Sequence, residues 1–471
     1  MPDLILIGAH LGYDPAAVPI GGGAQVASQL ARHWAQAPGF RLTVVGSGPR
    51  PPAAGVHYLP LPWRVPGQDG RPTELSVRGY ARFSRQFEQR ATELLEELAR
   101  RQDPSNTCIV HNDICEAADF ARVHELGFRQ VAIFHVDVVD YTARVYLRGK
   151  CSGAALARAY RRLEALGVHR WLPEVAKLIL KKQQDCARHC DLLVVPSQEM
   201  ALRLRRAYPW LDADRVLVTP WGVAGEAPSP GVAAQVAAIR EEYGLDNRGP
   251  VLLTLSRISP EKGQDILLGA LRLWERRGGE PLTLFICGAP AFMHGQAYFA
   301  KLQRLARRLR RSRVFFVGHV GGARKAAFFE IADLYVFPSR HESYGLTLVE
   351  AMAAGLPVLT TPHLSARELV RPQWGRVRPP TPEGIYQGLV ELLSLGEELA
   401  QMGARARRFA RQLEFSQAAD RLAQAIRRLF QDPRPPEPGE VAEKTGGRCP
   451  PPTWWSRGDL NPCRRDESPV S

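Results

Sequence analysis

Short runs of aliphatic and β-branched residues recur along the first half of the chain and predict the strands of a parallel sheet. Longer stretches with apolar residues at helical spacing separate most of these runs. Strands that alternate with helices are typical of βαβ units, in which successive strands lie parallel. The predicted strands cover residues 4–7, 42–45, 108–110, 131–134, 192–195 and 216–218.

The same alternation resumes after a stretch rich in Pro and Gly at residues 221–231. The second set of predicted strands covers residues 251–255, 282–286, 314–317, 334–337 and 358–360. We therefore predict an α/β fold of two doubly wound, Rossmann-like domains, residues 1–222 and 223–412, that face a central cleft. Residues 413–430 are expected to form a helix that packs back on the N-terminal domain. The last segment, residues 431–471, is rich in Pro, Gly and charge without apolar periodicity, which predicts a disordered tail.

Composition and charge narrow the class of protein. The chain has 471 residues, of which 45% are hydrophobic and 23% charged, and no apolar run approaches the ~18 residues of a membrane span. Its eight cysteines do not form a disulfide pattern, so a cytoplasmic location is expected. The net charge of +14 suits a phosphate-bearing partner, which could be nucleic acid, anionic lipid or a nucleotide.

The most informative segment, residues 332–361, has the pattern of a strand, a loop, a helix, a turn and a second strand. Gly345 lies where the loop enters the helix, so the N–H groups of residues 344–347 and the helix dipole form a potential phosphate site. Glu342 precedes this helix and Glu350 lies inside it, so both carboxylates could bind one ligand. Glu350 could accept hydrogen bonds from a ribose diol, and Glu342 could meet a sugar hydroxyl. The alternative is that both are solvated surface acids.

A second segment, residues 252–263, is a strand followed by a loop that carries Arg257 and Lys262. Two cations at the carboxyl end of a strand could stabilise the charge that develops on a departing diphosphate. In isolation, exposed loop cations would be the simpler interpretation.

At these residues the sequence resembles a known family. The stretch HESYGLTLVEAMAAGLPVLTT is similar to the E-x7-E signature of the family-four retaining glycosyltransferases, which have the GT-B fold. Glu342 and Glu350 occupy the two Glu positions, and residues 256–263 resemble the family's G/S-R-x-x-x-x-K-G loop. The resemblance implies a hexosyltransferase that takes a sugar from a nucleoside-diphosphate donor in the C-terminal domain, retains the anomeric configuration, and needs no metal or other cofactor.

The resemblance also implies further site residues. Gly22 and Gly23, between the first strand and a helix, match a Gly-Gly loop that faces the donor, although a flexible turn is an equal alternative. His135 matches the His that touches the transferred sugar, although a lone His is more often structural. With Glu342 and Glu350, the implied donor-binding set comprises Arg257, Lys262, Ser343, Tyr344, Gly345, Leu346 and Thr347.

Some segments depart from the family pattern or carry weaker signals. Residues 361–368 lack the family's Gly-Gly loop, so close backbone approach to the donor is in doubt there. His111 and Asp113 are weaker candidates for the same crevice. The set Cys186, His189 and Cys190 lacks a fourth zinc ligand, and a D-x-D at residues 212–214 is short enough to be a turn, so no metal site is predicted.

Residues 144–188 carry an excess of Lys and Arg with interleaved apolar positions. One hypothesis is that this stretch contacts an anionic membrane surface, which would suit a lipid-linked acceptor, while a solvated helix face is the alternative. The acceptor could equally be a sugar or a small molecule. Competing functions are a GT-B sugar phosphorylase, a nucleotide-sugar epimerase, or a protein that binds nucleotide sugars or nucleic acid without catalysis. Nucleic acid is disfavoured because the basic stretches lack interleaved aromatic residues.

Overall fold

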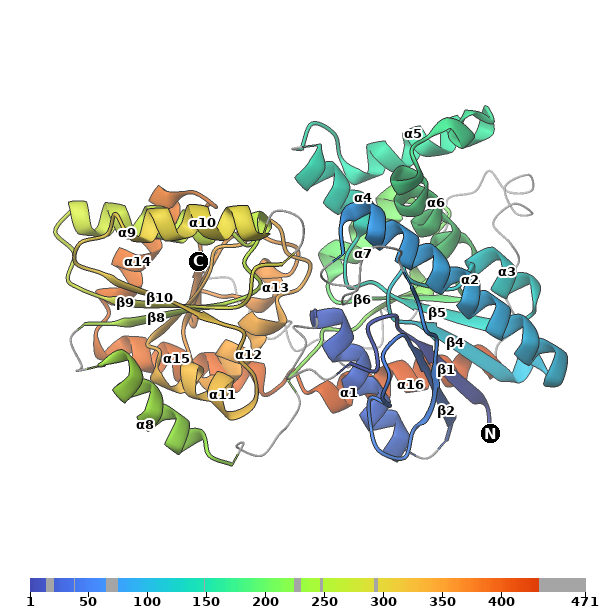
Figure 1. Ribbon diagram of the computed structural model, residues 1–471, viewed down its shortest axis with the longest axis horizontal. Coiled ribbons are helices and arrows are strands. Elements are labelled where there is room, and N and C mark those ends of the chain that lie inside the picture. The colour runs from blue at the N-terminus through green and yellow to red at the C-terminus, as the bar shows by residue number, and fades with distance from the viewer. Residues whose placement is uncertain are drawn as a thin grey trace, which may run out of the picture. The chain divides into compact units, whose positions relative to one another are not determined.

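The computed structural model describes residues 1–13, 21–37, 39–64, 75–147, 149–223, 230–245, 249–291 and 295–431, which belong to one compact unit. This unit contains two parallel β-sheets, each covered by helices on both faces (Figure 1). The tail predicted at residues 431–471 lies outside the described residues except for Gln431, which ends the last helix.

The first sheet has seven strands in the described residues, in the order β3-β2-β1-β4-β5-β6-β7, and every neighbouring pair is parallel. The strands are β1 (Asp3–Ile7), β2 (Arg41–Gly46), β3 (His57–Pro60), β4 (Thr107–His111), β5 (Arg129–Ile133), β6 (Leu192–Val195) and β7 (Val216–Val218). Because β1 pairs with both β2 and β4, the strand order reverses at β1. Such a reversal is a topological switch point, where ligands bind beyond the carboxyl ends of the strands.

The second sheet repeats this plan with six described strands in the order β10-β9-β8-β11-β12-β13. The strands are β8 (Val251–Leu255), β9 (Thr283–Cys287), β10 (Arg313–Gly318), β11 (Leu334–Phe337), β12 (Val358–Thr360) and β13 (Gly375–Val377). The order reverses between β8 and β11. The prediction of two doubly wound α/β halves is therefore confirmed.

Helices connect the strands and bury their apolar sides against the sheets. They are α1 (Gly22–Gln36), α2 (Val77–Arg101), α3 (Phe120–Glu125), α4 (Val138–Tyr141), α5 (Gly153–Ala165), α6 (Glu174–His189), α7 (Gln198–Ala207), α8 (Val232–Tyr243), α9 (Gln264–Arg276), α10 (Gly295–Ala306), α11 (Gly322–Ile331), α12 (Leu346–Ala354), α13 (Ala366–Leu369), α14 (Pro382–Leu393), α15 (Glu397–Ala410) and α16 (Phe415–Gln431). Short turns of other helix types include η4 (Val168–Trp171), η5 (Ala213–Arg215) and η6 (Pro260–Lys262).

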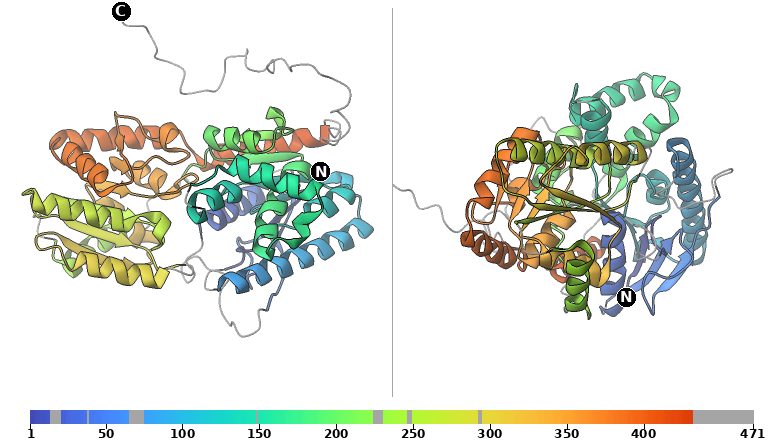
Figure 2. Two further views of the ribbon diagram at one scale, coloured as in Figure 1. Left: turned by 90° about the horizontal axis from the view of Figure 1, so that it is seen from above. Right: turned by 60° about the vertical axis from the view of Figure 1, so that its left-hand side comes forward.

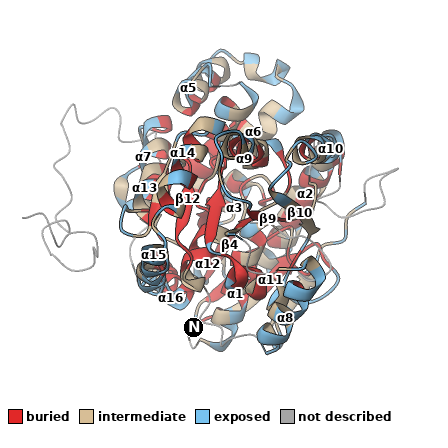
Figure 3. Ribbon diagram, turned by 90° about the vertical axis from the view of Figure 1, so that its left-hand side faces the viewer, coloured by how far each residue is buried: buried red, intermediate tan, exposed pale blue. Residues whose placement is uncertain are grey.

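Alternate residues of each strand belong to different cores, as the period of two requires. Leu4 of β1 packs with α1 and α16, whereas Ile5 packs with α2 on the other face. In the second sheet Leu252 packs with α9 and α14, whereas Leu253 lies in the core formed with α11 and α12. Figure 3 shows the strands as buried and the outer sides of the helices as exposed. Both faces of each sheet are thus covered, which leaves the strand ends as the place for a ligand.

The last described helix returns to the N-terminal half of the chain, where α16 contacts α1 (Figure 2). The indole of Trp34 donates to the carbonyl oxygen of Ala419 at 3.3 Å, and the His33 ring lies 2.7 Å from the Asp420 carboxylate. The ring of Trp221, in the connection after β7, is 6.0 Å from the ring of Phe415. The chain therefore crosses twice between the two sheets, once before β8 and once before α16.

Two strands were not predicted from the sequence, and both lie at sheet edges. The residues of β3 are exposed or partly exposed, and β13 has only three residues. Each lacks the buried apolar run that identifies the central strands. Among the described residues, no helix is long and apolar enough to cross a membrane.

Candidate functional site

The loops that follow the carboxyl ends of the switch-point strands carry almost all the site residues predicted from the sequence. Lys262 follows β8, and Glu342 follows β11. On the first sheet, Gly22 begins the helix after β1, and His135 lies just beyond β5. These positions agree with the general location of ligands in doubly wound sheets.

Lys262 and Glu342 form an ion pair at the end of the second sheet. The Lys262 Nζ donates to Glu342 Oε2 at 2.5 Å, and both side chains are largely buried. Burial by itself raises the pKa of Glu342, but the charge and hydrogen bond of Lys262 outweigh it and lower the pKa to about 2. Glu342 is therefore a carboxylate at any physiological pH.

The loops of Lys262 and Glu342 are fixed against each other. Gly263 has a φ of 69°, and a Cβ built there would lie 2.1 Å from the carbonyl oxygen of Pro338, so only glycine fits. The backbone N–H of Arg340 donates to the carbonyl oxygen of Glu261 at 2.8 Å. The ion pair thus forms within a preorganised pair of loops.

Arg257 lies in the same loop, and its carbonyl oxygen accepts a hydrogen bond of 2.8 Å from the Gln264 side chain. Its charge acts on groups of the N-terminal half. It is among the causes that lower the pKa of His10, after burial, and it opposes the increase in the Tyr141 pKa that burial produces. Arg257 is therefore electrostatically coupled to the residues near the first sheet.

The helix α12 begins as the sequence predicted, with Gly345 as its N-cap at a φ of 90° and Gly355 as its C-cap. A helix begins with N–H groups that have no partner within the helix, here those of Leu346 and Thr347. The Thr347 hydroxyl contacts the Tyr335 hydroxyl at 2.9 Å, which fixes the first turn. The preceding Ser343 and Tyr344 are buried, so the chain approaches this helix along a defined path.

Glu350 of α12 has partners from two sides. Lys325 of α11 places its Nζ 2.7 Å from both carboxylate oxygens. Gln25 of α1 donates from Nε2 to Glu350 Oε1 at 3.3 Å. Gln25 thus connects the first turn of α1, which packs on the first sheet, with Glu350 of α12, which packs on the second sheet.

Gly22 and Gly23 were predicted as part of a loop, but they are the first two residues of α1. That detail was wrong because glycine is tolerated in the first turn of a helix, where it loses less than in the interior. Both glycines nevertheless lie close to other side chains. A Cβ at Gly23 would lie 2.8 Å from His135 Cδ2, and one at Gly22 would lie 3.0 Å from Leu346 Cδ1.

The ring of His135 is oriented by Asn112. His135 Nε2 lies 2.9 Å from Asn112 Oδ1, while the amide nitrogen of Asn112 donates to the carbonyl oxygen of Gly23 at 3.2 Å. Because the amide orientation makes Asn112 Oδ1 an acceptor, Nε2 carries the proton and Nδ1 is left as an acceptor. Burial lowers the pKa of His135 to about 4, so the ring is neutral at pH 7.

The two weaker candidates, His111 and Asp113, lie in different surroundings. His111 is fully buried, and its Nε2 is 3.1 Å from the side-chain oxygen of Gln130, so it is part of the core. Asp113 lies beside Gly23, with Oδ1 3.4 Å from the position of a Cβ there. Burial, and then the charge of Glu116, raise the pKa of Asp113. Glu116 also accepts a hydrogen bond from the Tyr80 hydroxyl.

Several residues at this site were not found from the sequence, namely Gln25, Asn112, Lys325 and His10. Lys325 and His10 belong to no motif and contact residues elsewhere in the chain. Asn112, which comes directly after a predicted strand, and Gln25, which follows the glycines at residues 21–23, carried a positional signal. Glu368, which ends the segment that departs from the family pattern, accepts hydrogen bonds through its carboxylate from the backbone N–H groups of Gln198 and Glu199 at the start of α7.

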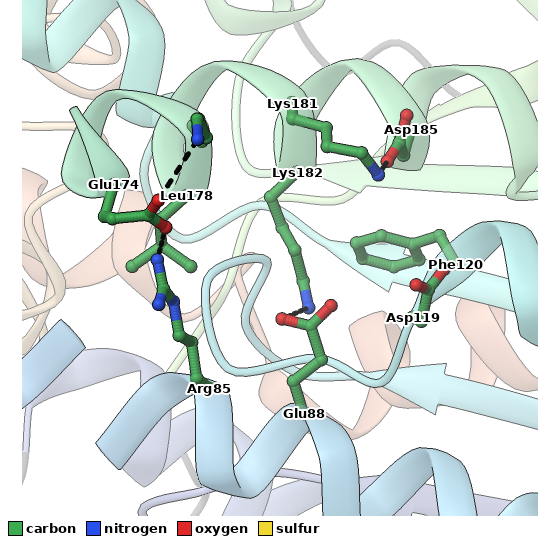
Figure 4. A pocket seen from close by; sticks show the side chains of 10 residues that line it. Arg85, Glu88, Asp119, Phe120, Glu174, Leu178, Lys181, Lys182 and Asp185 are labelled. Atoms are coloured by element: carbon green, nitrogen blue, oxygen red, sulfur yellow. Dashed lines mark hydrogen bonds and ion pairs between the residues drawn. The ribbon is translucent and has the colours of Figure 1, made fainter. Parts of the chain in front are cut away.

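A cavity of about 180 Å³ lies away from this site, between α2, the start of α3 and α6. Figure 4 shows its charged lining residues, and most of them pair with one another. Lys182 Nζ is 2.9 Å from Glu88 Oε2, Lys181 Nζ is 2.5 Å from Asp185 Oδ2, and Arg85 pairs with Glu174. Lys177 also pairs with Glu174. We interpret this cavity as a network of ion pairs.

Metal ligation finds no support within the part of the chain that the structure describes. No three His, Cys, Asp or Glu side chains there converge in a way that could hold a metal ion. Cys186 and Cys190 lie with their sulfurs 3.9 Å apart and are both buried. Asp212 of the D-x-D precedes the short turn η5.

Two parallel β-sheets, each covered by helices and each with predicted site residues in the loops beyond its switch point, define a protein of the GT-B fold. Comparison with known proteins agrees. Residues 235–409, which include Arg257, Lys262, Glu342 and Glu350, match the family described as "Glycosyl transferases group 1". The resemblance drawn from the sequence is thereby confirmed.

Particular relatives can also be named. The chain is 38% identical over 175 residues to D-inositol 3-phosphate glycosyltransferase 2 of Catenulispora acidiphila, a match of 36% of this chain and 39% of that protein. It is 28% identical over 269 residues to D-inositol 3-phosphate glycosyltransferase of Corynebacterium urealyticum, covering 56% of this chain and 62% of that protein. The alignments therefore span less than two thirds of the length of these relatives.

Solved structures share the fold over nearly the whole chain. Sucrose-phosphate synthase from Thermosynechococcus elongatus has a TM-score of 0.65 at 19% identity and covers 92% of this chain and 100% of that one. HepE from Anabaena, solved in complex with UDP and glucose, has a TM-score of 0.63 at 16% identity and covers 91% of this chain and 100% of that one. At these identities the likeness establishes the fold alone.

Proposed function

We propose that this protein is a retaining glycosyltransferase that transfers a sugar from a nucleoside-diphosphate donor to an acceptor hydroxyl. The observation that carries the proposal is the convergence at the two switch points. Lys262, Glu342 and the start of α12 come together on the second sheet, and Gln25 joins α1 of the first sheet to Glu350. The family match over residues 235–409 supports the same activity.

In this proposal, Arg257, Lys262 and the first turn of α12 stabilise the leaving diphosphate. When the bond between the anomeric carbon and the phosphate oxygen breaks, negative charge develops on that oxygen. Fixed cations and free N–H groups aimed at it lower the barrier. Lys262 is held by Glu342 in a preorganised loop, so it needs little rearrangement to meet the phosphate.

The remaining polar groups orient the donor. Glu350 accepts hydrogen bonds from the ribose hydroxyls, and Lys325 holds its carboxylate in place. Glu342 and His135 address the transferred sugar. Because His135 is neutral and its Nδ1 is an acceptor, a sugar hydroxyl can donate to it.

The donor nucleotide and the acceptor are open to direct test. HepE was solved with UDP and glucose, and the curated relatives carry the name D-inositol 3-phosphate glycosyltransferase, so UDP-glucose and an inositol phosphate belong in the first trials. We further propose a cytoplasmic location, because the six cysteines of the described residues are all unpaired.

A thermal-shift panel of UDP, GDP and ADP sugars is the first experiment, since a ligand at a hundred times its Kd stabilises a fold by about 2.7 kcal/mol. The stabilising donor is then incubated with candidate acceptors, and the anomeric configuration of the product is read by NMR. A new glycosidic bond with the donor's configuration supports the proposal. Inverted product, epimerised donor, phosphorolysis or the absence of binding by every nucleotide sugar would overturn it. Repeating the assay with EDTA tests the expectation that no metal is needed.

A further inference from the structure

Within the described residues, the exposed large apolar side chains are concentrated in one stretch of the chain. Of the ten large hydrophobic side chains that are exposed in the described part of the chain, six lie between residues 146 and 175. The most exposed of these are Trp171 at 88% and Leu166 at 75%, with Val168 at 42% between them. All three lie in the connection between α5 and α6, which we call the 166–171 turn.

This turn is ordered by its own contacts. Gly167 adopts a φ of 70° and donates its N–H to the carbonyl oxygen of Glu164 at 2.9 Å. The His169 ring packs edge-on against Tyr160 of α5 with 6.3 Å between centroids. The N–H of Leu172 donates to the carbonyl oxygen of His169 at 3.1 Å and closes the turn. Leu166, Val168 and Trp171 are therefore presented to solvent by a fixed backbone.

The helix that leads to the turn is anchored to the N-terminal sheet domain. Arg161 of α5 donates to the carbonyl oxygen of Ala207 at 2.7 Å, and its guanidinium lies over the Trp210 ring, 4.9 Å from the centroid. Ala157 and Tyr160 are buried on the same side of α5. The apolar turn thus stands at the end of a helix that is anchored by these contacts.

Cations accompany the apolar residues. Arg158, Arg162 and Leu166 succeed one another at intervals of four, so they form a stripe along one side of α5 that ends at the turn. Arg158 and Arg162 are both exposed, and Arg170 is exposed within the turn itself. A helix rises ~1.5 Å per residue, which places Arg162 about 6 Å behind Leu166 along the axis.

We propose that the 166–171 turn inserts into the headgroup region of an anionic membrane, with Arg158, Arg162 and Arg170 contacting lipid phosphates. A membrane matches both features of this surface, because apolar side chains at an interface bury about 5–10 Å deep and cations one turn behind them meet the phosphates. Trp is enriched at this depth. A solvated face would not explain why the apolar side chains gather at one turn.

The proposal is independent of the transfer reaction, so its test does not need activity. The full chain is sedimented with vesicles of phosphatidylglycerol mixed with phosphatidylcholine and with vesicles of phosphatidylcholine alone. Binding is expected only to the anionic vesicles and should weaken as salt increases. The double variant Leu166→Ser/Trp171→Ser should bind at least about tenfold more weakly, and Arg158→Glu/Arg162→Glu should lose at least about fivefold per cation removed.

Matched controls come from exposed residues elsewhere. Leu202→Ser/Val390→Ser removes two other exposed apolar side chains, and Arg304→Glu/Arg308→Glu changes two exposed cations at the same spacing. Both controls should bind vesicles as the unaltered chain does. The proposal is overturned if the unaltered chain ignores anionic vesicles, or if the turn variants bind as well as the controls. It is also overturned if Leu166→Ser/Trp171→Ser converts a dimer to a monomer in analytical ultracentrifugation, since a second copy then covers this face.

Discussion

The ion pair between Lys262 and Glu342 allows one prediction to be worked out in detail, because stability and activity should respond to it differently. The pKa of Glu342 is lowered from its ordinary value of 4.5 to about 2. This difference corresponds to about 3 kcal/mol in favour of the ionised carboxylate in the folded state. Since the folded pKa is depressed, the stabilisation is fully present above pH 4.5 and is lost as the pH falls toward 2.

Replacing Lys262 by Met keeps much of the side-chain volume and removes the charge. Burial then dominates, so the pKa of Glu342 rises and the carboxylate is left without its cation. We expect the free energy of unfolding at pH 7 to fall by about 3 kcal/mol, the usual cost of breaking a buried pair. The double variant Lys262→Met/Glu342→Gln has no unpaired charge, so most of this loss should be regained.

Activity should not change in parallel with stability. Loss of one preorganised donor to a developing oxyanion costs about 10²-fold to 10³-fold in turnover, and the double variant lacks the same cation. Urea unfolding at pH 7 and kcat with the identified donor are measured for both variants and for Glu342→Gln alone. The reasoning about the pair fails if Lys262→Met is as stable as the unaltered chain. The reasoning about the leaving group fails if Lys262→Met keeps turnover within a few-fold.

Further substitutions should have distinct effects on transfer, donor binding and stability. Gly23→Val would place side-chain atoms against the His135 ring, which lies 2.8 Å from the position of a Cβ there, so transfer should be abolished while circular dichroism stays native. Lys325→Met should raise the KM for the donor about tenfold with a smaller change in kcat, because it releases Glu350, which we propose binds the donor remote from the reacting bond. Trp221→Ala should cost about 3–5 kcal/mol in urea unfolding, since its ring is fully buried against Phe415. For His135, whose folded pKa of about 4 lies below the ordinary 6.5, stability should be lost as pH falls from 6.5 to 4, and His135→Asn should flatten that part of the unfolding profile.

The sequence predicted the strands that form an apolar run, including the partly buried edge strands β7 and β10. Central strands such as β4 and β6 are runs of fully buried residues, and such runs are readable without tertiary information. The edge strand β3 lacks such a run and ends at Pro60, so it has the pattern of a loop. The distinction between loop and helix at Gly22 failed for a related reason, because the residue at which a helix begins depends on tertiary contacts that local spacing does not encode.

The residues of the candidate site show the same distinction between those that the sequence could locate and those that it could not. Lys262, Glu342 and Glu350 stand in motifs whose spacing is local, so the sequence located them. Lys325 and Gln25 meet Glu350 only after the chain has folded; nothing along the chain near Lys325 marks it, and the glycines beside Gln25 do not reveal its partner. Sequence patterns could therefore identify the groups proposed to touch the donor, but not the groups that hold them.

The groups that hold the site also indicate how a donor would enter it. Glu350 is bound by Lys325 and Gln25, and Glu342 is bound by Lys262. A donor that uses these carboxylates must exchange with existing hydrogen bonds, so its net gain is the difference between two sets of contacts. Gln25 stands on α1, beside the glycines that contact His135 and Leu346. Displacing Gln25 from Glu350 by a ribose would release the hydrogen bond that joins α1 to α12, and would thereby couple nucleotide binding to the glycine contacts at the proposed sugar site.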